Sequence, residues 1–375
     1  MRILDRYVLQ KFAIPFIYCF LGFIAIWLVF DLSDNGPDFI EARTPLPLIL
    51  EFYGTQIPEI IVISLPVGAL LALLYSLTQM SRSNEIVAIL TSGVGVVRII
   101  VPLMFVGLLL TGVTWYFNYE QAPHAAAIKK QMLKDIKRGK KKEPGLTAHL
   151  FVNREDVRTW YMRRIRPAQM EAKDVQVVQQ DADGNITKMW YTQEAKFRPA
   201  TSEWVFDRAR VVDVDLDGNI VSQKTVPELY IKGWTETPWR IASSALNPDY
   251  LGIGELKEYL KYNADFPEAR LAPFETQLQY RYAIPWVCLL VIFIAAPMGI
   301  VFSRRGILGG VATAIGLFFS FVFVSSLFLA LGKGSRITPF VAAWGPMILF
   351  GSIALGLLWF RATNRDLPKF KIPGF

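Results

Sequence analysis

The sequence predicts a polytopic α-helical membrane protein with six transmembrane helices and an inserted β-jellyroll domain outside the membrane. The chain of 375 residues is 53% hydrophobic and only 19% charged, whereas soluble domains carry about 25% charged residues. Its apolar residues gather into six runs, each near the length of about 20 residues that a helix needs to cross a bilayer. A polar stretch between the third and fourth runs contains closely spaced strand signals.

The distribution of basic residues predicts the orientation of the chain, because Lys and Arg are enriched on the cytoplasmic side of membrane proteins. One face of the predicted bundle holds eleven of them: Arg2, Arg6, Lys11, Arg82, Arg98, Arg304, Arg305, Arg361, Arg365, Lys369 and Lys371. The short loops of the other face hold three: Arg43, Lys333 and Arg336. Both termini are therefore expected in the cytoplasm. The net charge of +8 follows from this topology and does not indicate nucleic-acid binding.

Residues 1–119 form the first predicted domain and contain three spans. The first span, Phe12–Phe30, follows a basic lead-in and ends on the outer side at Asp31. The second and third spans are Ile60–Met80 and Ile99–Tyr119, each 21 residues without a charge. The stretch between these two spans must lie at the cytoplasmic face.

This stretch predicts a short coupling helix at about residues 83–92. Ser83 precedes Asn84 and Glu85, so a hydroxyl is placed to accept an orphan backbone N–H and a carboxylate meets the positive helix end. Gly93 is suited to a left-handed helix cap. The apolar residues beside Glu85 are more numerous than a water-facing helix needs, so they are expected to meet lipid, another span or a partner's groove.

Residues 120–274 form the predicted outer region. Ala125–Arg138 lacks Gly and Pro and is expected to continue the third helix beyond the membrane. Eight strand signals follow, and Asp181–Asn185 and Asp215–Asn219 have the Asp-Gly pattern of hairpin turns. They predict a β-jellyroll at about 146–247, before a short helix at about 254–262.

Residues 275–375 supply the remaining spans and a cytoplasmic tail. These spans are Tyr282–Phe302, Gly306–Gly332 and Ile337–Phe360. Gly306, Gly310 and Ala314 recur at a spacing of four, which gives a small-residue surface for close helix packing. A moving gate would use the same surface.

Charged residues at the outer ends of the spans are candidate substrate contacts. Lys130, Lys134 and Lys137 lie on one helical face just above the bilayer, where the headgroup of an anionic amphiphile would lie; a solvated face is the alternative. Asp31 and Asp34 have no Lys near them in the sequence, and solvated carboxylates are again the plainer interpretation.

The sequence gives no indication of an enzyme or of a metal site on this chain. It contains no G-x-x-x-x-G-K-[ST] phosphate loop and no Ser/His/Asp set in the spans. His124 and His149 stand without nearby ligands. Asp213–Gly218 imitates the opening of a calcium loop, but Lys224 occupies the position where a bidentate Glu is required.

Several segments together form a recognisable pattern. By this pattern the chain resembles the LptF/LptG (YjgP/YjgQ) lipopolysaccharide-export permeases over essentially its whole length. The segments that carry the resemblance are the Ser83-Asn84-Glu85-Ile86-Val87-Ala88 start, the Ser92-Gly93-Val94 turn, Gln121-Ala122-Pro123, and the fourth span with Pro285 and Pro297. The resemblance implies one half of an ABC transporter in the bacterial inner membrane, with a periplasmic β-jellyroll.

The resemblance also implies what the assembly does and with what partners. A second, paralogous half would complete a cavity that takes lipopolysaccharide or a related glycolipid from the membrane. A cytoplasmic ATPase dimer, which would bind ATP and Mg, would supply the energy, and a periplasmic β-jellyroll bridge protein would receive the lipid. No cofactor is expected on this chain itself.

Specific residues take roles from the resemblance. Glu85 matches the acidic position of the family's coupling helix, so it is expected to contact the ATPase together with Arg82, Ser83, Asn84, Ile86, Ile89 and Gly93. Lys129, Lys130 and Lys134 fall in the family's region of basic headgroup contacts. Asp31 and Asp34 depart from the basic residues often found at the outer end of the first helix, so a bridging divalent cation or a different headgroup is an alternative there.

Two other functions remain open from the sequence. A membrane-anchored structural or sensory protein would bind a ligand with its β-domain and would tolerate substitution in the coupling helix. A secondary transporter would need ionisable residues within its spans, and the predicted spans contain none. The sequence does not distinguish an LptF-like half from an LptG-like half.

Overall fold

The computed structural model describes residues 3–138, 146–181, 183–215, 218–243, 247–264, 266–300 and 307–363. The chain divides into two compact units. Unit 1 comprises Met1–Lys140, Pro248–Lys257 and Ala272–Phe375, and unit 2 comprises Lys141–Asn247 and Glu258–Leu271. Each unit has its own hydrophobic core.

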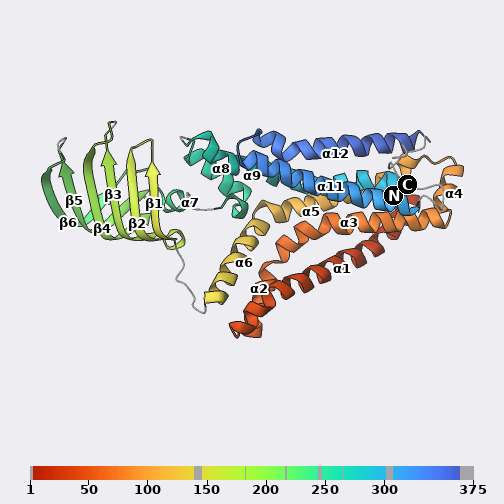
Figure 1. Cartoon of the computed structure of the whole chain (residues 1–375), viewed down its shortest axis with the longest axis horizontal. Coiled ribbons are helices and arrows are strands. Elements are labelled where there is room, and N and C mark those ends of the chain that lie inside the picture. Colours follow the sequence, from red (N-terminus) through yellow and green to blue (C-terminus); the bar gives the residue numbers. More distant parts are fainter. Residues whose placement is uncertain are drawn as a thin grey trace, which may run out of the picture. The chain divides into compact units, whose positions relative to one another are not determined.

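Unit 1 is a helical bundle in which long helices lie side by side (Figure 1). Six described helical segments are long and apolar enough to cross a bilayer, which confirms the predicted number of spans. They are α1 (Ile3–Glu41), α3 (Ile57–Arg82), α5 (Val96–Tyr119), α9 with α10 (Glu268–Ala283 and Val287–Gly299), α11 (Ile307–Lys333) and α12 (Pro339–Ala362). The shorter helices are α2 (Leu46–Thr55), α4 (Glu85–Thr91), α6 (Gln121–Arg138) and α8 (Ile253–Tyr262).

Helix α3 is the most deeply buried of the spans. In its most apolar stretch 72% of the residues are buried, against 6% for α1 and 17% for α11. Leu73 and Leu77 of α3 pack into one apolar core with Ile99 of α5 and Val291 of α10. Because a lipid tail is as apolar as a leucine side chain, close packing and not burial from water must hold these helices together.

The helix of the first span continues beyond the predicted end of the span. The sequence placed the end of the span at Asp31, and α1 runs on without a break to Glu41 and contains Pro15 and Pro37. Phe39, near its end, is 4% exposed and meets the ring of Phe52 from α2 edge-on at 5.3 Å. This tertiary contact outweighs the helix-breaking tendency of Pro37, which removes one backbone donor.

The third helix was predicted to continue unbroken beyond the membrane. This prediction is wrong, because the helix is interrupted at one residue. Helix α5 ends at Tyr119, Glu120 leaves the helical region with φ −139° and ψ −36°, and α6 starts at Gln121. Pro123 has no backbone N–H to donate to the Tyr119 carbonyl oxygen, so the hydrogen-bond ladder of α5 cannot continue unbroken into α6. The backbone of Gly252 also packs here, where a Cβ would lie 3.0 Å from the Tyr119 carbonyl oxygen.

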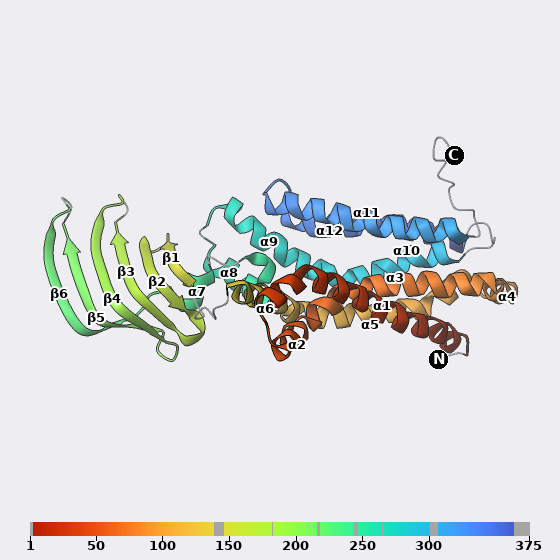
Figure 2. The same ribbon diagram turned by 60° about the horizontal axis from the view of Figure 1, so that its bottom comes forward.

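Unit 2 is built on one antiparallel sheet of six described strands in sequential order. They are β1 (Leu146–Asn153), β2 (Arg158–Arg166), β3 (Glu171–Gln180), β4 (Ile186–Arg198), β5 (Glu203–Val214) and β6 (Ile220–Ile231). The sheet is curved (Figure 2). The predicted β-domain is confirmed, although these strands form a meander in one sheet, whereas a jelly roll has two facing sheets.

One face of the sheet carries the core of unit 2. Trp160, Trp204 and Phe206 are fully buried there, and α7 (Pro238–Ser243) adds the buried side chain of Ile241. Both predicted hairpin turns are present, with left-handed Gly184 (φ 90°) and Gly218 (φ 82°).

Two predicted strand pairs merge into single strands. The runs before and after Ala209 join in β5, and those around Pro227 join in β6. Pro227 is tolerated because β6 is an edge among the described strands and because neither Pro227 nor Arg208 opposite it is among the paired positions.

The close approach of α11 to α12 gives a test of the helix packing in unit 1. A Cβ at Gly332 would lie 2.4 Å from the Cβ of Ala342, whereas a Cβ at Gly316 on the same helix meets nothing within 4 Å. Gly332→Ala should therefore lower the free energy of unfolding by about 1–3 kcal/mol, the usual cost of overpacking. Thermal unfolding of both variants in the same detergent checks this; equal melting temperatures for Gly332→Ala and Gly316→Ala would contradict the packing.

Candidate functional site

Helix α4 joins α3 to α5, where the sequence placed the coupling helix. Its N-cap is Asn84, in a left-handed conformation with φ 59° and no side-chain cap bond. The predicted capping role of Ser83 is wrong, because its hydroxyl lies 2.8 Å from the Gln79 carbonyl oxygen and 3.0 Å from Glu85 Oε1. The left-handed cap at Gly93 is confirmed, with φ 85° and its N–H donated to Leu90 O.

Glu85 is joined to the start of α1. The Tyr7 hydroxyl donates to Glu85 Oε2 at 2.8 Å, and the Lys11 ammonium donates to Oε1 at 3.2 Å. Burial alone would raise the pKa of Glu85, but the hydrogen bonds from Tyr7, Ser83 and Lys11 outweigh it, so the pKa lies below its usual value. The carboxylate therefore stays ionised at neutral pH and links α4 to the first span, although Tyr7 and Lys11 are 78 and 74 residues away in the sequence.

Further polar contacts tie neighbouring helices near α4. Arg98 of α5 forms an ion pair with Asp5 of α1 at 2.8 Å. The Ser81 hydroxyl at the end of α3 donates to the Gly299 carbonyl oxygen at 3.1 Å. Arg361 of α12 donates from Nε to the Pro297 carbonyl oxygen at 3.1 Å. Helices α1, α5, α10 and α12 are thus all fastened at the end of the bundle that carries α4.

The apolar residues of α4 face two ways. Ile86 is fully buried and packs into the core of unit 1, and Ile89 is half-buried against it. Val87 is 37% exposed and lines a groove of about 570 Å³ with Leu90, Val94 and other residues up to Ala362. Arg82, Ser83 and Asn84 are exposed before the helix. One face of α4 is therefore anchored, and the other is available for contact.

A second group of predicted residues meets near the junction of α1 and α6. Lys129 Nζ lies 2.5 Å from Asp31 Oδ1 and 4.9 Å from the ring centre of Trp27. Lys130 lies over the ring of Tyr250 at 5.0 Å. The sequence showed no Lys near Asp31, but folding brings one there from 98 residues away. Asp34 and Lys134 are exposed, and neither has an ion pair among the described residues.

Sequence reasoning missed the aromatic and polar residues around this ion pair. Burial raises the pKa of Tyr53 to about 12, with a further contribution from the neighbouring Asp31 carboxylate. Glu59 is electrostatically coupled to Lys129 and Asp31. A further network joins Asn118, Arg281 and Asp249, with Lys333 2.5 Å from Asp249. None of these residues has a local sequence pattern that signals such a partner.

The small-residue surface is only partly within the described residues. Gly306 lies outside them. Gly310 is half-buried, and Ala314 is fully buried in the core of unit 1. A packing role for Ala314 agrees with its burial, and a gating role stays a prediction.

Six apolar helical segments, a short helix between the second and third, and a separate antiparallel sheet define a multi-pass membrane protein with an inserted β-domain. Residues 6–360 match the protein family described as "Lipopolysaccharide export system permease LptF/LptG". The chain therefore belongs to the LptF/LptG family of permeases for lipopolysaccharide export in the inner membrane. It is similar to the lipopolysaccharide export system permease proteins LptG of Escherichia coli K12 and of E. coli O6:H1 strain CFT073, with 23% identity over 312 residues, 81% of this chain and 83% of each relative.

The lowered pKa of Glu85 predicts a pH dependence of stability. A group whose pKa is depressed by folding stabilises the protein above its unfolded-state pKa, about 4.3 for Glu, and this contribution is lost as pH falls through the folded-state pKa. Wild type should therefore be more stable than Glu85→Gln at pH 7, and this difference should shrink below about pH 4. Chemical unfolding of both proteins between pH 3 and 7 checks the sign; a difference that grows at low pH would contradict it.

Proposed function

We propose that the chain is one half of an ATP-driven exporter that extracts lipopolysaccharide, or a related glycolipid, from the inner membrane. In this proposal α4 and both termini lie in the cytoplasm and unit 2 lies in the periplasm, as the bias of Lys and Arg indicates. A cytoplasmic ATPase dimer that binds ATP and Mg would act on α4. A paralogous half would complete the cavity, and a periplasmic β-jellyroll protein would receive the lipid.

The single observation that carries the proposal is the bonding of Glu85. Its carboxylate holds Tyr7 and Lys11 of α1, while the opposite face of α4 lines a groove that is available for contact. A force applied to α4 is therefore transmitted directly to α1. Helix α1 also packs on the core through Val8 and Phe12 and pairs Asp5 with Arg98 of α5, but only 6% of its most apolar stretch is buried within the chain.

The exposed helices support a paired, lipid-accepting assembly. Helices α1 and α11 present apolar residues outward, including Phe30 (69% exposed) and Phe323 (71% exposed). Exposing an acyl chain to water costs about 0.8 kcal/mol per CH₂ group, so a path for a glycolipid must be apolar throughout. Such faces would line a cavity when a second half stands opposite.

The ion pair between Lys129 and Asp31 supports a role in receiving a headgroup. A phosphate can replace the Asp31 carboxylate as the partner of Lys129, since a phosphate oxygen is an equally strong acceptor for an ammonium. Lys130 and Lys134 are exposed on the same helix and add positive charge. In this proposal Asp31 keeps Lys129 neutralised until an anionic headgroup arrives.

The edges of the sheet support a contact with a periplasmic β-protein. Among the described strands β1 pairs only with β2, and β6 pairs only with β5. Each edge therefore has backbone groups that a strand from another chain can extend.

The coupling role can be tested by co-purification with the ATPase. Val87→Lys places a charge on the contact face of α4 and leaves the bonds of Glu85 in place, so it should lower the retained ATPase at least tenfold. Glu85→Lys should do the same, because it also repels Lys11. Glu51→Lys on α2, an exposed charge reversal at a site remote from α4, is the control and should retain the ATPase.

The outcome also separates this proposal from a membrane-anchored structural or sensory protein. Full retention of the ATPase and unchanged nucleotide-dependent lipid release from vesicles in both α4 variants would contradict coupling through α4.

A further inference from the structure

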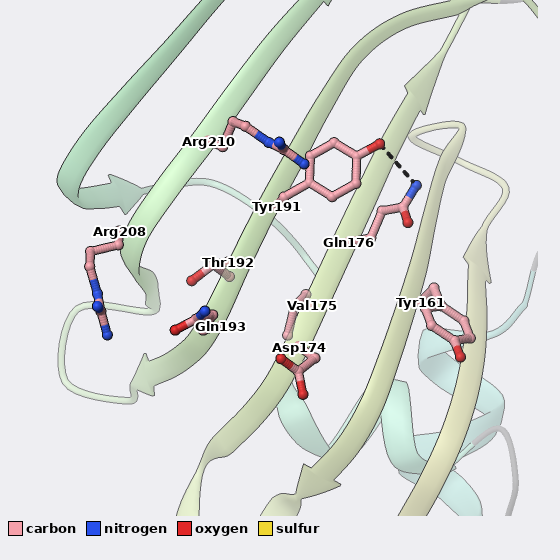
Figure 3. A pocket seen from close by; sticks show the side chains of 9 residues that line it. All are labelled: Tyr161, Asp174, Val175, Gln176, Tyr191, Thr192, Gln193, Arg208 and Arg210. Atoms are coloured by element: carbon pink, nitrogen blue, oxygen red, sulfur yellow. Dashed lines mark hydrogen bonds between the residues drawn. The ribbon is translucent and has the colours of Figure 1, made fainter.

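The face of the sheet opposite the core carries a straight row of polar and aromatic residues. Tyr161 of β2 pairs with Gln176 of β3, Gln176 pairs with Tyr191 of β4, and Tyr191 pairs with Arg210 of β5. Residues directly opposite each other in neighbouring strands have Cβ atoms about 5 Å apart. The four side chains therefore form a continuous strip across four strands (Figure 3).

Two irregular backbone positions lie beside this strip. Asp174 of β3 and Arg208 of β5 have left-handed backbones, with φ 50° and 49°, and both are skipped in the strand pairing. The strand register is the same before and after both positions, so they interrupt the pairing without inserting an extra residue. A hollow of about 430 Å³ lies beside them, lined by the strip together with Asp174, Val175, Thr192, Gln193 and Arg208. This volume is within the range of about 300–1,000 Å³ for small-molecule sites.

The charges around the hollow leave one cation available. Asp174 is paired with Arg163 at 2.8 Å, and Arg208 is 3.4 Å from Asp207. Arg210 instead stacks on the ring of Tyr191 at 4.7 Å, and no carboxylate lies within ion-pair distance of it among the described residues. Stacking fixes the orientation of the Arg210 guanidinium plane. The edge of the guanidinium can then bind a carboxylate or phosphate in a bidentate contact.

We propose that this hollow binds an acidic saccharide. The ring of Tyr161, which is 48% exposed, offers a flat surface for the C–H face of a sugar. The amide of Gln176 can both donate to and accept from sugar hydroxyls. Arg210 would bind the acidic group of the sugar. Apart from Val175 the residues that line the hollow are polar, charged or aromatic, which favours a sugar over an acyl chain or an apolar peptide, and the proposal does not depend on the export function.

The test uses the full-length protein in phosphatidylcholine nanodiscs and a disaccharide that contains glucuronic acid. Cellobiose is the neutral control of similar size, and inorganic phosphate is the control for a simple anion site. Saturation-transfer NMR should give a dissociation constant for the acidic disaccharide at least tenfold lower than that for cellobiose. Arg210→Gln should remove this preference, Arg210→Lys should restore part of it, and Tyr161→Ala should weaken binding of both sugars.

A matched control variant exists on the same sheet. Arg198 also stacks on a tyrosine, Tyr230, at 5.3 Å, but it does not line the hollow. Arg198→Gln should leave the preference unchanged. Absence of saturable binding, equal affinity for both disaccharides, equal competition by phosphate, or the same loss in Arg198→Gln would overturn the proposal.

The source of the sugar can be separated in the same experiment. Nanodiscs that also contain glucuronosyl diacylglycerol would block the free disaccharide if a lipid-linked sugar reaches the hollow. Without such blocking, a soluble saccharide is the ligand. Both results support the site, because each requires that the free disaccharide bind in the absence of the lipid.

Discussion

The carboxylate of Glu85 is the contact on which the rest of this account depends. It accepts hydrogen bonds from Tyr7 and Lys11 of α1 and from Ser83 beside it, so the short helix α4 and the first span are held together. Without these bonds α4 would be anchored mainly by the buried side chain of Ile86 in the core of unit 1. A push on α4 would then reach α1 only through this shared apolar core, to which Val8 and Phe12 of α1 also belong.

The packing of unit 1 explains why α1 is suited to respond. Helix α3 is buried among its neighbours and forms the fixed part of the bundle, whereas the residues in the apolar stretch of α1 are mostly half-buried or exposed. At its far end α1 is fastened by the pair of Asp31 with Lys129 and by the contact of Phe39 with Phe52. Polar contacts thus hold both ends of α1, and a charged ligand can compete for the one at Asp31.

The sequence predicted the features that depend on local pattern. The six spans follow from apolar length, and the hairpin turns and the cap at Gly93 follow from glycine at left-handed positions. The break at Glu120 and the hydrogen bonds of Ser83 are local features, but other errors have a common cause, which is contact between distant residues. The contact of Phe39 with Phe52 stabilises α1 beyond Asp31. No local sequence pattern indicates that Lys129, 98 residues away, pairs with Asp31. The partners of Glu85 were missed for the same reason, since Tyr7 and Lys11 belong to another helix.

The most direct test measures whether α1 follows α4. Spin labels at Ala88 of α4 and Ile40 of α1, in a protein whose Cys19 and Cys288 are replaced by Ala, report the distance between them in complex with the ATPase. Trapping the nucleotide-bound state should leave this distance distribution unchanged in the wild type because α1 follows α4, whereas Tyr7→Phe combined with Lys11→Gln should allow it to shift because α4 then moves without α1. The same shift in the wild type and the double variant would contradict transmission through Glu85.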